Sequence, residues 1–164
     1  MQQKVLIIGG GFAGINTAQK LKNAPVEITL IDRTNHHLFQ PLLYQVATAA
    51  LSSSDIATPL REIFRDQENV RIIMSEALSV DTEKQVVNLT YCDPVSYDYL
   101  VLATGAKHSY FGNEAWGKFA PGIKTLEDAQ GIREHILRSF ELAERSHNRF
   151  EIQHYLKWNW QLYS

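Results

Sequence analysis

The sequence contains a single cysteine, Cys92, among its 164 residues. One cysteine excludes a disulfide within the chain and a redox-active cysteine pair, and it suits a reducing compartment such as the cytoplasm. Cys92 stands before Asp93-Pro94, so we expect it to be a small residue in a loop. No apolar run approaches the ~20 residues of a membrane-spanning helix, and the N-terminus has the pattern of a strand rather than of a secretory signal.

A strong charge of one sign is also lacking, since the formal net charge is −2 at pH 7 and no basic patch stands out. This balance gives no indication of a nucleic-acid partner. The sequence has no G-x-S-x-G, and no Ser-His-Asp or Cys-His nucleophile arrangement is suggested. We expect no metal site, because the adjacent His36 and His37 point apart and no acidic or cysteine partner has chelating spacing.

What is present is a dinucleotide-binding pattern at the N-terminus. An apolar strand from Lys4 to Ile8 is followed by G-x-G-x-x-G, a helix, a second apolar strand over Val26–Ile31 and the acidic Asp32. A G-x-G-x-x-G alone is a weak signal, and an ordinary glycine-rich turn is the alternative. Because strand, turn, helix, second strand and acid occur in this order, the sequence predicts a βαβ unit that binds a dinucleotide.

Each glycine of this pattern, and the acid that follows it, has an expected role in the fold or in binding. Gly9 allows the tight strand-to-helix turn, Gly11 lets the backbone approach a pyrophosphate, and Gly14 lets the helix pack closely on the strand. The phosphates would lie against the N–H groups at the positive end of the helix. Asp32 would accept hydrogen bonds from a ribose hydroxyl. Asp32 does not distinguish FAD from NAD, because either ribose satisfies it.

Further along, the patterns predict helices and strands in turn. Pro41 favours the start of a helix that runs through Leu51. Caps at Ser52–Asp55 predict another helix through about Phe64, with a buried side formed by Ile56, Leu60, Ile63 and Phe64. Strands are predicted over residues 70–80, 85–89 and 99–103, the first two joined by a hairpin at residues 81–84. A capping-box-like Thr125–Asp128 precedes a helix with an apolar stripe of Leu126, Ala129, Ile132, Ile136, Phe140 and Ala143.

Five segments together resemble the N-terminal part of type II NADH dehydrogenases, the single-subunit flavoprotein NADH:quinone oxidoreductases of respiratory membranes. The resemblance covers about residues 4–145 and is carried by Val5–Gly14, Asn35–Ala47, Asp55–Ala57, Asp98–Ala106 and Pro121–Ala129. Its specific part is H-H-x-F-Q-P-L-L-Y-Q-V-A, because the glycine turn and Ala-Thr-Gly occur in many other flavoproteins. The resemblance implies an α/β fold, namely a Rossmann-type FAD-binding domain of the two-dinucleotide-binding flavoprotein superfamily, with an inserted β-hairpin and incomplete in this chain.

The resemblance also implies which residues hold FAD. The first βαβ unit would bind the ADP half through Gly9, Gly11, Phe12, Ala13, Gly14 and Asp32. The loop residues His37, Phe39, Gln40 and Pro41 would lie along the flavin or its phosphate arm. Ala77 would face the adenine through its backbone, and Thr104 and Gly105 would bring the chain back across the cofactor. Without the surrounding motif, the two histidines could be ordinary loop residues, Phe39 could be core, and Thr104-Gly105 could be an ordinary strand end.

Family members pass hydride from NADH to the flavin and electrons onward to a membrane quinone. The resemblance therefore implies an FAD-dependent, non-proton-pumping NADH:quinone oxidoreductase, for which the sequence identifies no catalytic residue. Full-length relatives would be peripheral on the inner face of the cell membrane, and this chain is expected to be cytoplasmic. The oligomeric state is not predicted.

The sequence also departs from this family. A family member has a second G-x-G-x-x-G for NADH, whereas no glycine follows Gly131 here. Residues for quinone and membrane binding are also missing, so we expect a truncated form without turnover of its own. Its FAD-binding domain would span residues 1–112, a linker and the first helix of a truncated NAD-binding domain residues 113–149, and an atypical tail residues 150–164.

Two alternatives remain open at this point. The chain could be a non-catalytic FAD- or dinucleotide-binding fragment, or it could derive from another flavin-dependent quinone reductase of the same superfamily. A sulfide-oxidising member is disfavoured, because it would need more cysteines than Cys92.

Overall fold

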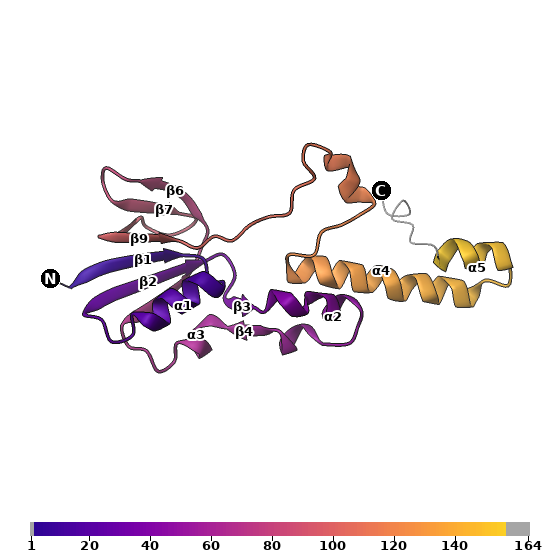
Figure 1. Cartoon of the computed structure of the whole chain (residues 1–164), viewed down its shortest axis with the longest axis horizontal. Helices are drawn as coiled ribbons and strands as arrows, with labels where there is room; N and C mark the ends of the chain where they lie inside the picture. Colours follow the sequence, from indigo (N-terminus) through magenta and orange to yellow (C-terminus); the bar gives the residue numbers. More distant parts are fainter. Residues whose placement is uncertain (1, 157–164) are drawn as a thin grey trace. The chain divides into compact units, whose positions relative to one another are not determined.

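The computed structural model describes residues 2–156 (Figure 1). The chain divides into two compact units. The first unit is formed by Met1–His37 and Ala57–Ala106, and the second unit by Leu38–Ile56 and Lys107–Ser164. The predicted domain boundaries at residues 112 and 149 stay a prediction.

A parallel four-stranded sheet forms the centre of the first unit. Its strands are β1 (Gln3–Ile8), β2 (Val26–Asp32), β5 (Val70–Met74) and β9 (Tyr99–Leu102), in the order β5-β2-β1-β9. Helix α1 (Phe12–Lys20) connects β1 to β2, which pair in parallel with Ile8 opposite Ile31. The predicted βαβ unit is therefore confirmed.

Both faces of this sheet are covered, which explains the nearly continuous apolar runs in β1 and β2. On one face, Ile7 and Leu30 pack with Ile15 and Ala18 of α1 and with Leu60. On the other face, Leu6 and Ile31 pack against Val87 and Leu89 of a second, three-stranded sheet, with its partly buried Ala77 and Val95, and against Tyr97, which follows that sheet. Alternate residues of one strand thus serve two separate cores.

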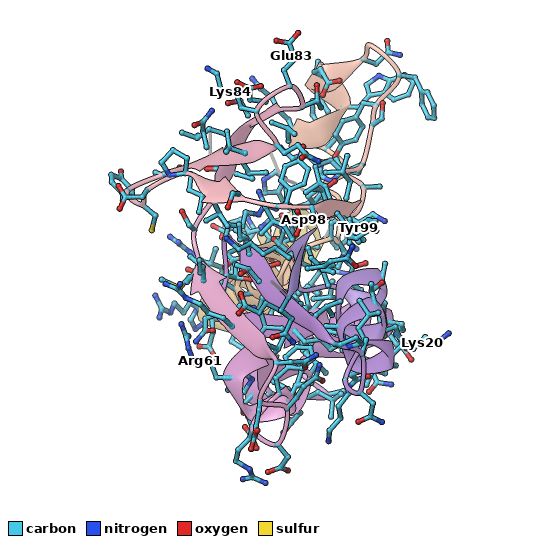
Figure 2. All side chains as sticks on the ribbon, turned by 90° about the vertical axis from the view of Figure 1, so that its left-hand side faces the viewer. Lys20, Arg61, Glu83, Lys84, Asp98 and Tyr99 are labelled. Atoms are coloured by element: carbon cyan, nitrogen blue, oxygen red, sulfur yellow. The ribbon has the colours of Figure 1, made fainter. Side chains whose placement is uncertain are left out.

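The second sheet consists of β6 (Ala77–Asp81), β7 (Val86–Leu89) and β8 (Val95–Ser96), all antiparallel. The predicted hairpin is confirmed, and its turn is held by the Asp81 carboxylate, which accepts hydrogen bonds from the N–H groups of Glu83 and Lys84. Figure 2 shows Glu83 and Lys84 at the outer tip of this hairpin.

The prediction of one strand over residues 70–80 was wrong, because β5 ends at Met74 and β6 begins at Ala77 in a different sheet. Ser75 lies at the break. Its N–H donates to the Asp32 carbonyl at the end of β2, whereas its hydroxyl donates to the Thr90 carbonyl beyond β7. The change of pairing partner at Ser75 separates the two strands without a glycine or proline in the sequence.

The predicted helix from the Ser52–Asp55 caps to Phe64 was also wrong. The structure has a 3-10 turn (Ser53–Asp55), the short strand β4 (Ala57–Pro59), which pairs with β3 (His36–Leu38), and the one-turn helix α3 (Leu60–Ile63). Pro59 disfavours a helical conformation of the residue before it and cannot donate an N–H within a helix. The expected burial of Ile56, Leu60 and Phe64 is nevertheless confirmed, and Ile63 is partly buried.

In the second unit, the segment that follows Pro41 forms a 3-10 turn (Gln40–Leu42) and the short helix α2 (Leu43–Ala47). The helix ends four residues before the predicted Leu51, and Ala49 takes a left-handed backbone conformation with φ of 62°. The long helix α4 (Leu126–Arg145) packs against α2 and is followed by α5 (Arg149–Leu156) (Figure 1). A short 3-10 segment covers Glu114–Lys118.

The apolar stripe of α4 is buried over its first half. Ala129 and Ile132 pack with Leu43, Val46 and Ile56. In the second half of the stripe, Phe140 is 57% exposed, whereas Ala143 is buried, as is His135 beside the stripe. Because α2 is only five residues long, the core that it forms with α4 extends no further than Ile136. Within residues 2–156, no helix has the combination of length and apolar character needed to cross a membrane. Of the predicted tail, residues 157–164 lie outside the described residues.

The start of α4 is a capping box, as predicted. The Thr125 side chain accepts a hydrogen bond from the Asp128 N–H at 3.1 Å, and the Asp128 carboxylate accepts from the Thr125 and Lys124 N–H groups at 2.9 Å each. Partial burial favours a higher pKa of the Asp128 carboxyl, but these hydrogen bonds and the charge of His108 outweigh it, so the pKa lies below the ordinary 3.8. The stabilisation that these hydrogen bonds give is therefore fully present above pH 3.8, and it is lost as the pH falls through the folded-state pKa of Asp128.

We expect Asp128→Ala to lower the free energy of unfolding by about 1 kcal/mol at pH 7, because two N–H groups lose their acceptor. The difference from the parent chain should shrink as the pH falls from 7 to 3, because below the unfolded-state pKa of 3.8 the carboxyl group binds a proton more readily in the unfolded chain than in the folded one. Urea unfolding followed by circular dichroism at both pH values measures this. Glu127→Ala, which removes an exposed acid from the same helical turn, is the control. An effect of Asp128→Ala that is equally large at pH 3 would contradict the prediction.

Candidate functional site

The glycine turn between β1 and α1 lies at the carboxyl end of the parallel sheet. Gly9 has φ of 112°, and its N–H donates to the Ile31 carbonyl at 2.8 Å. A Cβ at Gly9 would overlap the carbonyl group of Ala103, directly after β9. This close approach brings Thr104 beside the turn. Glycine at position 9 is thus required by the fold itself, as the sequence predicted.

Gly14 is also required by the fold. A Cβ at this position would overlap the carbonyl oxygen of Gly9 and would lie 3.3 Å from the Ile7 side chain. Without a side chain at Gly14, the first turn of α1 packs directly on the backbone that leaves β1. The expected role of Gly14 in helix–strand packing is therefore confirmed.

Gly11 differs from both, because within residues 2–156 no atom beyond its two chain neighbours lies within 4 Å of the position that a Cβ would take there. Its φ of −79° and ψ of −170° are open to any residue. Gly11 is the N-cap of α1, and no side chain caps the helix. The fold itself therefore does not require glycine at this position. A phosphate that approaches this end of the helix closely would require it, because a side chain would stand in its way. The space beside Gly11 is open in the described residues.

The Asp32 carboxylate lies at the same turn. Its Oδ2 accepts a hydrogen bond from the Gly10 N–H at 2.5 Å. Its Oδ1 accepts from the Thr34 N–H at 2.7 Å and from the Thr34 hydroxyl at 2.8 Å. The structure therefore brings Asp32 to the glycine turn, where it joins the end of β2 to the end of β1. Oδ1 thus uses both of its lone pairs, whereas Oδ2 retains one with which to accept a ligand hydroxyl.

His37 contacts the other side of the turn. Its Nδ1 lies 3.2 Å from the Gly10 carbonyl oxygen, and its ring meets the Phe12 ring edge-on with centroids 4.8 Å apart. Phe12 is 45% exposed. The N-terminal turn of α1, which includes Ala13, thus lies close to Asp32, His37 and Thr104 in the first unit.

The remaining predicted site residues lie elsewhere. Gly105 follows Thr104, is exposed and has φ of 71°. Ala77 is partly buried in β6 and pairs with Leu89. Phe39, Gln40 and Pro41 belong to the second unit, where the Phe39 N–H donates to the Ile56 carbonyl and the Gln40 amide donates to the Lys124 carbonyl at 3.3 Å. A role for these residues in binding a cofactor stays a prediction.

Sequence reasoning missed Gly10 and Thr34. A Cβ at Gly10 would lie 2.7 Å from the Leu60 side chain and 3.1 Å from Asp32 Oδ2, so the turn needs a third glycine. The G-x-G-x-x-G pattern leaves this position free, and only contact with α3 reveals the requirement. Thr34 follows Asp32 by two residues, a spacing at which Asp side chains commonly bond the backbone, and this signal was available in the sequence.

Comparison with known proteins agrees with this arrangement. Residues 3–148 match the sequence model of the pyridine nucleotide-disulphide oxidoreductase family. The chain is 50% identical over 148 residues to the type II NADH:quinone oxidoreductase NdhA of Mycobacterium tuberculosis, which covers 88% of this chain and 32% of that relative.

Two solved structures are similar to this one. NDH2 from Plasmodium falciparum, in complex with NADH, has a TM-score of 0.83 and 26% identity over 93% of this chain and 32% of its own. The sulfide:quinone oxidoreductase of the hyperthermophilic bacterium Aquifex aeolicus has a TM-score of 0.76 and 32% identity over 85% of this chain and 32% of its own.

The chain spans about a third of the length of these relatives. The predicted α/β fold and the predicted resemblance to type II NADH:quinone oxidoreductases are both confirmed. The family name refers to a disulfide, but Cys92, the chain's single cysteine, is free and exposed. From the match over residues 3–148, we conclude that the chain belongs to the pyridine nucleotide-disulphide oxidoreductase family.

Proposed function

We propose that this chain supplies the FAD-binding part of an FAD-dependent NADH:quinone oxidoreductase. The observation that carries the proposal is the difference between the glycines of the turn. The fold itself excludes a side chain at Gly9 and Gly14, but it leaves open space at Gly11, where a pyrophosphate would approach. The 50% identity to a mycobacterial type II NADH:quinone oxidoreductase supports the choice of reaction.

In this proposal the N-terminal end of α1 binds the pyrophosphate through the backbone at Gly11, Phe12 and Ala13. Asp32 accepts a hydrogen bond from the adenosine ribose while it holds the Gly10 N–H. Thr104 and Gly105, which continue from the Gly9–Ala103 contact, approach the cofactor from β9. Ala77 would face the adenine through its backbone, and the loop with His37, Phe39, Gln40 and Pro41 would lie along the flavin or its phosphate arm.

FAD, when bound, accepts hydride and passes electrons on, and the protein contributes binding and orientation. No residue of this chain is assigned to NADH or to the quinone, because the sequence has no second G-x-G-x-x-G after Gly131. We therefore expect the purified chain to bind FAD but to show no NADH:quinone turnover above a free-FAD control. Turnover well above that control would contradict this assignment.

The proposal is tested by Gly11→Ala. The added methyl group meets no protein atom, so the free energy of unfolding should stay within about 0.5 kcal/mol of the parent. It would occupy the space of the pyrophosphate, and overpacking of this kind costs about 1–3 kcal/mol, which weakens FAD binding about tenfold or more. FAD fluorescence titration measures the affinity, with NAD as the comparison ligand.

Gly131→Ala is the control, since Gly131 lies in the second unit, also has open space around it and has no positive φ. Unchanged FAD affinity of Gly11→Ala would overturn the proposed pyrophosphate position. Tighter binding of NAD than of FAD by the parent chain would favour a dinucleotide-binding function without flavin chemistry.

The likeness to a sulfide:quinone oxidoreductase favours a second candidate, another flavin-dependent quinone reductase. The two differ in reductant. If sulfide bleaches the FAD-loaded chain anaerobically faster than it bleaches free FAD, the second candidate replaces the first. We expect sulfide to react no faster than with free FAD, because Cys92 stands alone.

A further inference from the structure

The backbone around Gly10 is held by three separate hydrogen bonds. The Gly9 N–H donates to the Ile31 carbonyl at 2.8 Å, and the Gly10 N–H donates to Asp32 at 2.5 Å. The Gly10 carbonyl oxygen lies 3.2 Å from His37 Nδ1. Two of the three partners are therefore side chains. His37 bonds the carbonyl of the peptide that joins Gly10 to Gly11, so this bond holds that peptide in its orientation.

The hydrogen bond to the Gly10 carbonyl determines the tautomer of His37. A carbonyl oxygen only accepts hydrogen bonds, so Nδ1 of His37 must carry the hydrogen. In a trans peptide the carbonyl and the following N–H point in opposite directions, and the described residues contain no cis peptide. With the Gly10 carbonyl turned toward His37, the Gly11 N–H is turned away from His37, at the end of α1 where Gly11 has open space.

We infer that His37 is a positioning residue that sets the orientation of the Gly10–Gly11 peptide and so presents the Gly11 N–H to the phosphate of a dinucleotide. This inference rests on the proposed function for its ligand, but its first claim concerns the free protein. His37 acts here through the glycine turn, which differs from lying along the cofactor. Phe12 packs edge-on against the His37 ring and keeps the imidazole in place.

Two substitutions separate the donor from the ring. His37→Phe keeps an aromatic ring against Phe12 but removes the N–H. His37→Asn loses the ring but keeps an N–H close to the place of Nδ1. If the hydrogen bond matters, His37→Phe should weaken FAD binding about tenfold, the upper end of what one neutral hydrogen bond contributes, and His37→Asn should stay within about threefold of the parent.

The free protein is examined first, by ¹⁵N NMR of the full chain without FAD, at a pH where the His37 ring nitrogens show a neutral imidazole. We expect the Nδ1–H tautomer, and we expect the Gly11 amide resonance to shift in His37→Phe more than in His37→Asn. The Nε2–H tautomer, or an unshifted Gly11 amide in His37→Phe, would overturn the inference whether or not FAD binds.

FAD titration of the three proteins follows. Loss of affinity in His37→Phe and its rescue in His37→Asn supports the inference, and equal affinity of His37→Phe and the parent overturns it. If the parent chain binds no FAD, the proposed function fails, and the tautomer and the Gly11 amide shift then decide the orientation of the turn by themselves.

Discussion

Gly9→Ala is expected to destabilise the first unit by at least about 3 kcal/mol. The residue would have to adopt φ of 112°, which L side chains rarely take, and backbone strain of this kind costs about 1–3 kcal/mol. Its Cβ would also overlap the Ala103 carbonyl, which is backbone and cannot rotate away. Overpacking adds about 1–3 kcal/mol, and β9 would have to separate from β1. Urea unfolding followed by circular dichroism measures the loss.

Gly131→Ala is the matched control for this substitution. Gly131 lies inside α4, is exposed, and has no neighbouring atom within 4 Å of a Cβ. The same change should therefore stabilise the chain by about 0.5–1 kcal/mol, because alanine has the higher helix propensity. A Gly9→Ala variant as stable as the parent would mean that the Gly9–Ala103 approach is not present in the folded protein.

Asp32→Ala is expected to lower both stability and affinity. The carboxylate accepts three hydrogen bonds, one from Gly10 and two from Thr34, and Gly10 is buried. A hydrogen bond to a charged group contributes about 1.5–3 kcal/mol, and a buried N–H left without an acceptor is costly, so we expect a loss of about 3 kcal/mol in the free energy of unfolding. Loss of the ribose contact and of the turn should weaken FAD binding about 100-fold.

Two further variants test whether the loss of stability comes from the hydrogen bonds that Asp32 accepts. Asp66→Ala removes an exposed carboxylate whose salt bridge with Arg65 is also exposed, so it should change stability by no more than about 0.5 kcal/mol. Thr34→Val removes one of the three bonds to Asp32 and should have an intermediate effect on stability. If Asp32→Ala unfolds at the same urea concentration as the parent, the bond from Gly10 to Asp32 does not hold the turn.

Elements whose signals lie among neighbouring residues could be predicted from the amino-acid pattern alone. Strand, glycine turn, helix and acid of the first βαβ unit follow from apolar runs and glycine spacing within Lys4–Asp32, and all were found. The hairpin at residues 81–84 and the capping box at Thr125 were likewise predicted, because a turn or a cap depends on side chains that bond their own neighbours.

The ends of such elements, and the contacts between them, depend on long-range packing. Ser75 divides one apolar run into two strands because its partners, Asp32 and Thr90, belong to different sheets. Phe140 is exposed because α2 is too short to cover it. At the candidate site, the Gly9–Ala103 approach and the His37–Gly10 hydrogen bond join residues that are distant in sequence. Such contacts depend on the order of strands in the sheet, and a pattern confined to neighbouring residues carries no information about that order.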